Sequence, residues 1–228
     1  WNGTGKGAQG TWPSPKNSYF GIIDTAGFPK DSYYFYQSQW NDEVNTLHIL
    51  PAWNEDAVKK DSSGKVPVVV YTDAKKVELF FTDAKTGDKK SLGTKEFTQK
   101  QSNTQGYTYQ YYEGTDKSGT EHKNLYLTWQ VPYKAGTISA VAYGQDGQKI
   151  SEEKLNGRTS VTTTGEKKNL KATVDRDTIA ADGADLTYVT VDVTDKDGNI
   201  IPNAEDKVTF KVEGEGKLVG IDNGRQDD

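Results

Sequence analysis

Carboxylates are the most numerous groups in this sequence that could do chemistry. Of the 33 Asp and Glu residues, Asp24 alone lies inside an apolar stretch, between Ile23 and Thr25. Hydrolysis of a glycosidic bond needs two carboxyl groups about 5–9.5 Å apart, one of them with a raised pKa. Asp24 has two open roles, facing a cleft or capping a turn, and its place at the end of an apolar run favours the turn. Most other acids alternate with lysines and predict solvated surface.

Histidine and cysteine usage gives no catalytic or metal centre. His48 and His122 are far apart and cysteine is absent, which excludes thiol catalysis, disulfides and Cys-ligated zinc. His48 lies in a short apolar run and is predicted to pack with a hydrogen-bonded ring. Asp195, Asp197 and Asn199 imitate the start of a calcium loop, but the required Gly and twelfth-position Glu are missing, so a turn is favoured. We expect no cofactor and no metal.

Nucleotide, nucleic-acid and membrane functions are also disfavoured. Gly3, Gly5, Gly7 and Gly10 imitate a nucleotide loop, but no predicted strand precedes them and no helix follows. There is no GxSxG nucleophile motif. The net charge of -5 supplies no basic stripe for phosphates, and no apolar run is long enough for a membrane span. We expect neither a nucleic-acid partner nor membrane insertion.

Aromatic residues are more informative. Trp1, Trp12, Tyr19 and Phe20 bracket the glycine-rich loop. Flat rings stack on the C–H faces of sugars, although rings in loops more often pack beneath the loop. Both roles stay open from spacing alone.

A single helix is predicted near the N-terminus. Asp31 or Ser32 offers an N-cap, and Tyr33, Tyr36 and Trp40 follow at helical spacing. The helix would therefore carry an aromatic stripe. Because the rest of the chain reads as β, we expect this stripe to face a surface that the chain does not supply.

Alternation of apolar and polar residues predicts strands through the rest of the chain. Seven strands over about 110 residues are typical of an immunoglobulin-like sandwich, with Trp129, Leu79 and Val69 as expected core members. Four further strands are too few to close a second sandwich. The expected strands are 47–50, 66–71, 76–81, 107–112, 124–131, 137–143 and 149–154, and then 170–174, 186–193, 208–212 and 217–221.

Three sequence blocks in this order closely resemble the C-terminal half of glycoside hydrolase family 2 β-galactosidases. They read YFGIIDTAGFPKDSYYFYQSQW from Tyr19, LHILPAWN from Leu47 and VPVVVYTDAKKVELFF from Val66. The segment ADGADLTYVTVDVTDKDGNIIPNA, from Ala181, resembles the next immunoglobulin-like domain of the same enzymes. The chain looks most like the large cell-surface enzymes of Gram-positive bacteria.

The resemblance implies a fold class and a domain organisation. The fold would be mainly β, with immunoglobulin-like β-sandwich domains preceded by a remnant of a (β/α)8 barrel, namely a loop and the last helix. Residues 1–46 would be this remnant, 47–166 a complete sandwich and 167–228 a truncated second one. The chain begins at Trp1 and contains no methionine, so we expect a piece of a longer protein.

The resemblance also implies a function. The parent would hydrolyse terminal β-galactosides with retention, through two glutamates that lie upstream of this chain, so the chain alone would be inactive. Trp1 would stack on galactose in the substrate site. Galactoside-containing glycans would bind through the parent barrel, against which this chain packs, and the protein would be secreted or anchored to the cell wall.

Two other functions remain open. The first is a carbohydrate-binding or adhesive module of a surface protein, in which an exposed sheet face holds glycan. Tyr107, Tyr109, Tyr111 and Tyr112 could supply its aromatic platform, because alternate residues of a strand share a face. The second is a spacer that holds the barrel away from the cell wall.

Overall fold

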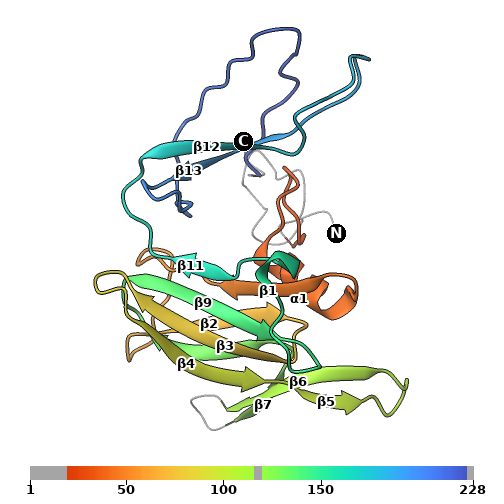
Figure 1. Ribbon diagram of the computed structural model, residues 1–228, viewed down its shortest axis with the longest axis vertical. Helices are drawn as coiled ribbons and strands as arrows, with labels where there is room; N and C mark the ends of the chain where they lie inside the picture. The colour runs from red at the N-terminus through yellow and green to blue at the C-terminus, as the bar shows by residue number, and fades with distance from the viewer. Residues whose placement is uncertain (1–19, 116–119, 225–228) are drawn as a thin grey trace, which may run out of the picture.

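The computed structural model describes residues 20–115 and 120–224. Helix α1 (Asp31–Trp40) comes first, and strands make up the other regular elements except for one short 3-10 turn. Figure 1 shows two layers of strands in the lower half, and a separate pair of strands, β12 and β13, above them. The described residues are mainly β, and no helix among them is long and apolar enough to cross a membrane.

The two layers are four-stranded sheets of a sandwich-like domain. The first has the order β10-β1-β2-β8 and the second the order β11-β9-β3-β4. Neighbouring strands are antiparallel except for β1 and β10, which pair in parallel. The bounds are β1 (Asn45–Leu50), β2 (Lys65–Thr72), β8 (Leu127–Pro132), β10 (Leu155–Asn156), β3 (Lys76–Asp83), β4 (Lys89–Glu96), β9 (Gly136–Tyr143) and β11 (Ser160–Thr162).

One hydrophobic core lies between these sheets. Alternate residues of β3 point into it, so Val77, Leu79 and Phe81 are buried as their spacing predicts. Trp129 is also buried there and donates from Nε1 to the carbonyl of Gly93, 3.3 Å away. The core members are Leu47, Ile49, Trp53, Val66, Val68, Val70, Ala74, Val77, Leu79, Phe81, Phe97, Leu127, Trp129, Val131, Ile138, Ala142 and Val161.

Two expectations for this domain were wrong. Val69 is not a core member, because β2 buries the even-numbered Val66, Val68 and Val70 and turns Val69 outward. Residues 149–154 do not form a strand; a 3-10 turn occupies Glu152–Lys154, and β10 begins after it. The sequence missed β4, whose eight residues include one apolar side chain, Leu92, and which pairs along one side of β3.

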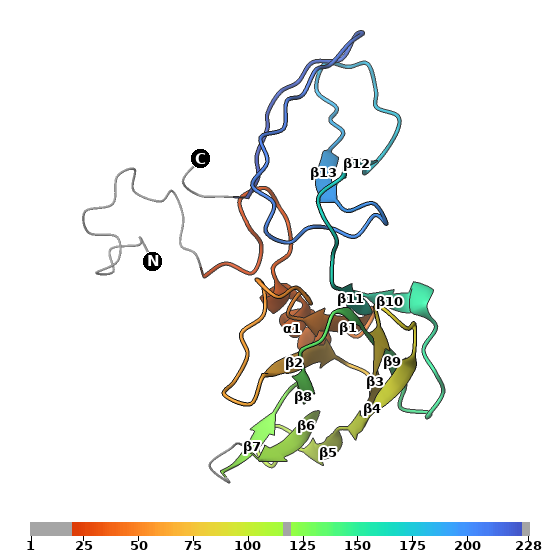
Figure 2. The same cartoon turned by 90° about the vertical axis from the view of Figure 1, so that its left-hand side faces the viewer.

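Helix α1 covers the outer face of the first sheet, as Figure 2 shows. β1 is therefore buried on both sides: Leu47 and Ile49 face the core, while Thr46 and His48 lie under the helix. The Thr46 hydroxyl donates to Gln37 Oε1 of the helix at 3.1 Å. The helix therefore forms an outer layer on the sandwich. One side of the helix packs on the first sheet, and the other side faces away from it.

A small third sheet projects from the sandwich, at the lower right of Figure 1. It contains β5 (Thr98–Gln101), β6 (Thr108–Thr115) and β7 (Glu121–Asn124) in the order β5-β6-β7. Only β6 was expected from the sequence, because β5 and β7 contain no apolar residue that could alternate.

The C-terminal region contains β12 (Asn169–Val174) and β13 (Val189–Thr194), which pair with each other only. The strands expected at 208–212 and 217–221 are not formed. From residue 166 to residue 224 the buried side chains are Thr194 and Asp195, and no hydrophobic side chain is buried. The described part of this region therefore forms one two-stranded sheet and has no hydrophobic core of its own.

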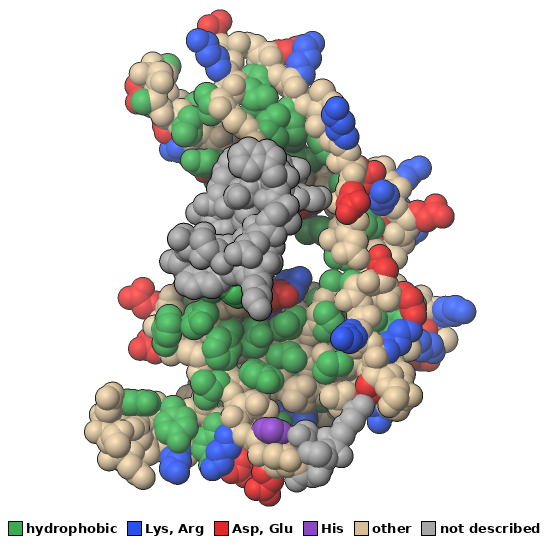
Figure 3. Space-filling model, turned by 180° about the vertical axis from the view of Figure 1, so that it is seen from behind, with side chains coloured by type: hydrophobic (Ala, Val, Ile, Leu, Met, Phe, Trp, Pro, Cys, Tyr) green, Lys and Arg blue, Asp and Glu red, His purple; other side chains and the backbone are tan. Residues whose placement is uncertain are grey.

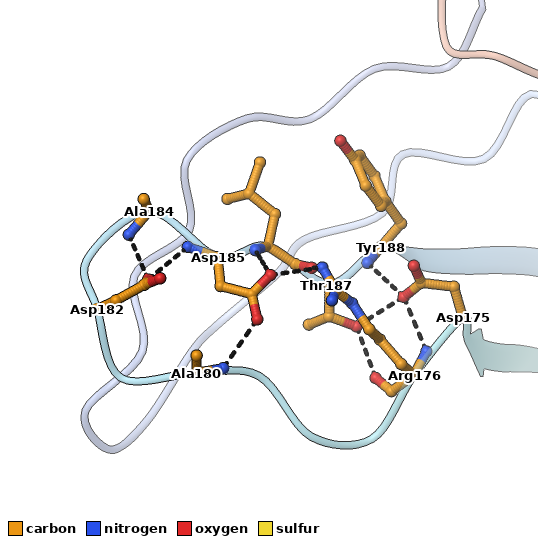
Figure 4. A network of polar contacts seen from close by, with 9 residues as sticks. Asp175, Arg176, Ala180, Asp182, Ala184, Asp185, Thr187 and Tyr188 are labelled. Atoms are coloured by element: carbon orange, nitrogen blue, oxygen red, sulfur yellow. Dashed lines mark hydrogen bonds and ion pairs between the residues drawn. The ribbon is translucent and has the colours of Figure 1, made fainter.

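Aspartates hold the long loop between β12 and β13, as Figure 4 shows. Asp175 Oδ1 accepts hydrogen bonds from the backbone N–H groups of Arg176 and Tyr188, at 2.9 and 2.8 Å. Asp182 accepts from the two backbone N–H groups at 184 and 185, and these bonds lower its pKa. Asp185 pairs with Arg176 at 2.7 Å. The carboxylates of this loop are thus used in shaping it.

Candidate functional site

A polar cluster joins the start of α1 to the sandwich. His48, 2% exposed, stacks on the ring of Tyr34 with centroids 3.9 Å apart and an interplanar angle of 8°. Its Nε2 lies 2.7 Å from Asp31 Oδ1. Arg158, which follows β10, reaches the same Asp31 oxygen with Nη2 at 2.5 Å. We call these four residues, Asp31, Tyr34, His48 and Arg158, the helix latch.

Hydrogen-bond donors fix the tautomer of His48. The backbone N–H of Arg158 donates to Nδ1 at 3.3 Å, which assigns the ring hydrogen to Nε2, where it is donated to Asp31. Arg158 Nη2, 3.1 Å from the same Nε2, is then a charged neighbour of this nitrogen and not its hydrogen-bond donor. Burial lowers the pKa of His48, since a buried ring disfavours the charged form. Burial of Asp31 opposes ionisation, yet its bonds to His48 and Arg158 hold the net pKa below the usual value. In the latch, a neutral imidazole and a guanidinium contact the same carboxylate oxygen, Asp31 Oδ1.

The polar groups of the latch are used to hold the helix. Both imidazole nitrogens are used within the cluster, and stacking on Tyr34 covers one face of the ring. Arg158 Nε is buried without a hydrogen-bond partner among the described residues. In residues 20–115 and 120–224 no three His, Cys, Asp or Glu side chains are grouped so as to hold a metal ion.

The predicted N-cap, Asp31 or Ser32, lies one or two residues after the observed one. Lys30 is the N-cap, and its side chain makes no capping bond. Asp31 is the first helical residue and uses its carboxylate for His48 and Arg158, as described above. The sequence thus predicted correctly that a helix starts here. The Asp31 carboxylate, however, bonds to the sandwich and does not cap the helix.

The opposite side of α1 carries exposed aromatic rings. Trp40 is 76% exposed and Tyr36 is 36% exposed, and their ring centroids lie 4.7 Å apart. Phe20, in the segment that leads to the helix, is 81% exposed, and Phe28 is also exposed. Seen from behind, the molecule shows hydrophobic side chains gathered over this region (Figure 3). We call Phe20, Phe28, Tyr36 and Trp40 the α1 face.

A second aromatic row lies on the projecting sheet. Tyr107 directly precedes β6, and Tyr109 and Tyr111 lie in it at alternate positions. Neighbouring ring centroids of the three are 6.3 and 6.0 Å apart. We call these three residues the tyrosine ladder. Tyr112, the fourth tyrosine of the expected platform, points away from the ladder and packs against the core beside Lys95.

The aspartates singled out from the sequence are turn formers. Asp24 Oδ1 accepts from the backbone N–H groups of Ala26 and Phe28 at 3.0 and 2.8 Å, which confirms the turn expected there. Asp195 accepts hydrogen bonds from the side-chain amide of Asn199 and from backbone N–H groups, including that of Gly165 at 3.0 Å, and its pKa is lowered to about 2. The turn expected there instead of a calcium loop is confirmed.

The sugar-stacking residues suggested by the sequence are largely untested. Trp1, Trp12 and Tyr19 lie outside the described residues. Phe20 is described and exposed, so it does not pack beneath a loop of the described chain. At the end of the apolar run that precedes Asp24, Ile23 forms an isolated antiparallel bridge with Pro29. Residue spacing within one segment could not have found the latch, because Arg158 is 110 positions from His48.

The sandwich, the latch and the exposed aromatic rows define a set of mainly β accessory domains. Comparison with known families agrees with this class. Residues 170–228 match the family described as "Glycoside hydrolase family 2 C-terminal domain 5", and residues 63–151 match "Domain of unknown function (DUF4982)". The chain therefore contains C-terminal domains of the glycoside hydrolase family 2 glycosidase type, similar to those of β-galactosidases and β-glucuronidases.

Individual relatives are much longer than this chain. A beta-galactosidase of Bacteroides ovatus is 33% identical over 213 residues, which are 93% of this chain and 20% of the relative. A putative beta-glucuronidase of Formosa agariphila is 33% identical over 204 residues, covering 90% of this chain and 16% of the relative. The crystal structure of a beta-glycosidase from Bacteroides vulgatus aligns with a TM-score of 0.68 and 29% identity, over 95% of this chain and 23% of that one. The chain thus spans about a fifth of such enzymes.

Proposed function

We propose that this chain is the non-catalytic C-terminal region of a retaining β-galactosidase of glycoside hydrolase family 2, and that its α1 face docks on the (β/α)8 catalytic barrel of that enzyme. Relatives named as β-galactosidases from two genera support the substrate class. Relatives named as β-glucuronidases keep a glucuronide-cleaving parent as the second candidate. The resemblance to Gram-positive cell-surface enzymes and an extracellular location stay predictions from the sequence.

The exposure of Trp40 on a firmly held helix is the observation that carries the docking proposal. An aromatic side chain of this size favours burial, because complete burial removes about 150–250 Å² from water. The latch fixes the first turn of α1, and Gln37 and Ser38 bury the opposite side against the sandwich. The helix therefore holds the α1 face outward in one orientation, as a preformed docking surface does.

The contacts of the acidic residues support the non-catalytic part of the proposal. The acids examined above shape turns or hold the latch. Burial raises the pKa of Asp73, but its Oδ1 accepts the backbone N–H of Thr46 at 2.5 Å, so this carboxyl group also serves a structural contact. Purified chain should not hydrolyse a chromogenic β-galactoside or β-glucuronide. Turnover of either substrate by the pure chain would refute the non-catalytic role.

The docking proposal is tested in the longer enzyme that carries this chain. Trp40→Ala should lower its melting temperature and weaken protection of the catalytic domain from proteolysis, whereas the same change in the chain alone should have little effect. Tyr188→Ala, at an exposed tyrosine of the C-terminal region, is the matched control. Equal effects of Trp40→Ala in the enzyme and in the chain alone would show that the α1 face is not covered. The relative rates on the two chromogenic substrates then assign the substrate class.

A further inference from the structure

The tyrosine ladder has the graded exposure of an open platform. Tyr107 is 56% exposed, Tyr109 is half-buried and Tyr111 is 9% exposed. Lys123 lies over the Tyr111 ring, with Nζ 5.0 Å from its centroid. Tyr107 and Tyr109, whose ring planes are inclined by 56° to each other, are therefore accessible to a ligand, whereas the Tyr111 ring is covered.

The other face of the projecting sheet anchors it to the sandwich. Gln110 donates from Nε2 to the carbonyl of Asp73 at 3.0 Å, and Lys95 Nζ donates to the hydroxyl of Tyr112 at 2.6 Å. Residues 110 and 112 alternate with the ladder residues, so these contacts turn the ladder away from the core. The tyrosine ladder is therefore held in place before a ligand binds, which reduces the conformational entropy lost on binding.

The borders of the ladder are polar. In the antiparallel register Tyr109 lies opposite Lys100 and Tyr111 lies opposite Thr98, which puts these side chains on the same face. On the other side lies Lys123, near Glu113 at 3.9 Å. The strands β5 and β7, which flank the ladder, contain no aliphatic residue.

This combination points to a carbohydrate ligand. We propose that the tyrosine ladder is a glycan-binding site, in which the rings of Tyr107 and Tyr109 stack on the C–H faces of consecutive pyranose units. The side chains of Thr98, Lys100 and Lys123 can then donate hydrogen bonds to the hydroxyl groups of the sugar or to a uronate carboxylate. A protein partner would require an apolar centre wider than one row of rings, which the polar strands on both sides do not supply. The inference rests on the proposed function only for the choice of glycan as ligand class.

Affinity electrophoresis of the full chain tests the proposal. The gels contain soluble β-galactan, polygalacturonate or no polysaccharide. The chain should be retarded by at least one of the two polymers. Tyr107→Ala and Tyr109→Ala should each weaken the affinity by roughly tenfold, the size expected for the loss of one stacked ring. If polygalacturonate alone retards the chain, and Lys100→Ala reduces this retardation, the site is assigned to acidic glycans.

Controls separate the possible failures. Tyr188→Ala removes an exposed tyrosine outside the ladder and should keep the wild-type retardation, and circular dichroism checks that each variant is folded. Absence of retardation by both polymers, or retardation unchanged in Tyr107→Ala and Tyr109→Ala, would overturn the proposal. A dimer in size-exclusion chromatography that is lost in Tyr107→Ala would also overturn the proposal, because the ladder would then be a contact between two copies of the chain. The test needs no catalytic domain, so its failure leaves the docking of the α1 face untouched.

Discussion

Replacing His48 by alanine should detach the start of α1 from the sandwich. The change removes the ring stacked on Tyr34 and the hydrogen bond to the Asp31 carboxylate. Aromatic contacts of this kind are worth about 0.5–1.5 kcal/mol and hydrogen bonds to charged groups about 1.5–3 kcal/mol. The expected loss in the free energy of unfolding is therefore about 2–4.5 kcal/mol, or about 4–18 °C in melting temperature for a chain of this size.

The second histidine of the chain is the matched control. His122 is exposed on β7, and His122→Ala should change the free energy of unfolding by less than about 0.5 kcal/mol. Urea denaturation of both variants, followed by circular dichroism, gives the two values under the same conditions. Equal, small losses in the two variants would refute the assigned role of the latch.

The latch also predicts how stability depends on pH. Burial lowers the pKa of His48, so the unfolded chain takes up a proton at a higher pH than the folded chain does. The contribution of the neutral ring is complete above a pH of about 6.5 and is lost as the pH falls through the lower pKa of the folded state. Asp31, with its lowered pKa, adds a loss only in the acid range below about pH 4. Wild-type stability that stays constant from pH 7 to pH 5, or a decline in that range kept in His48→Ala, would contradict this assignment.

Three further predictions concern the sandwich and the region after it. Gly157→Ala should destabilise the chain by about 2–4 kcal/mol in urea denaturation, because its φ is +117° and a Cβ would lie 2.6 Å from the Leu47 carbonyl oxygen; Gly147→Ala, at φ +78° with open space around it, should cost about half as much, and equal costs would rule out the clash. Trp53→Ala should cost about 3–5 kcal/mol, since the indole is fully buried and donates to a backbone carbonyl, and a loss below 1 kcal/mol would contradict that burial. Limited proteolysis of the isolated chain should cut within residues 166–224 before it cuts the sandwich, because this region buries no hydrophobic side chain; a first cut within the two four-stranded sheets would contradict the assignment.

The sequence predicted those strands in which apolar alternation and core packing coincide. Val77, Leu79 and Phe81 alternate and are buried, so β3 was found with nearly correct bounds. β4, β5 and β7 were missed because their stability comes from pairing with a neighbour, which leaves little apolar pattern to read. Residues 208–212 and 217–221 show the reverse case, since apolar alternation is present there without a paired strand.

The candidate site was predicted in part. The helix and the exposure of Tyr36 and Trp40 agree with the aromatic stripe read from their spacing. The latch could not be predicted, because His48 meets Asp31 and Arg158 only after β1 pairs with β10 beneath the helix. For Val69 the error has a simple cause, since a continuous valine run does not reveal which residues face the core.

Footprinting of Trp40 tests the central proposal most directly. Hydroxyl-radical labelling with mass spectrometry would compare the oxidation of this side chain in the isolated chain and in the longer enzyme, with the buried Trp53 as an internal reference. We predict strong labelling of Trp40 in the isolated chain, where it is 76% exposed, and protection by at least about fivefold in the enzyme. Labelling of Trp40 to the same extent in both proteins would contradict a docking role for the α1 face.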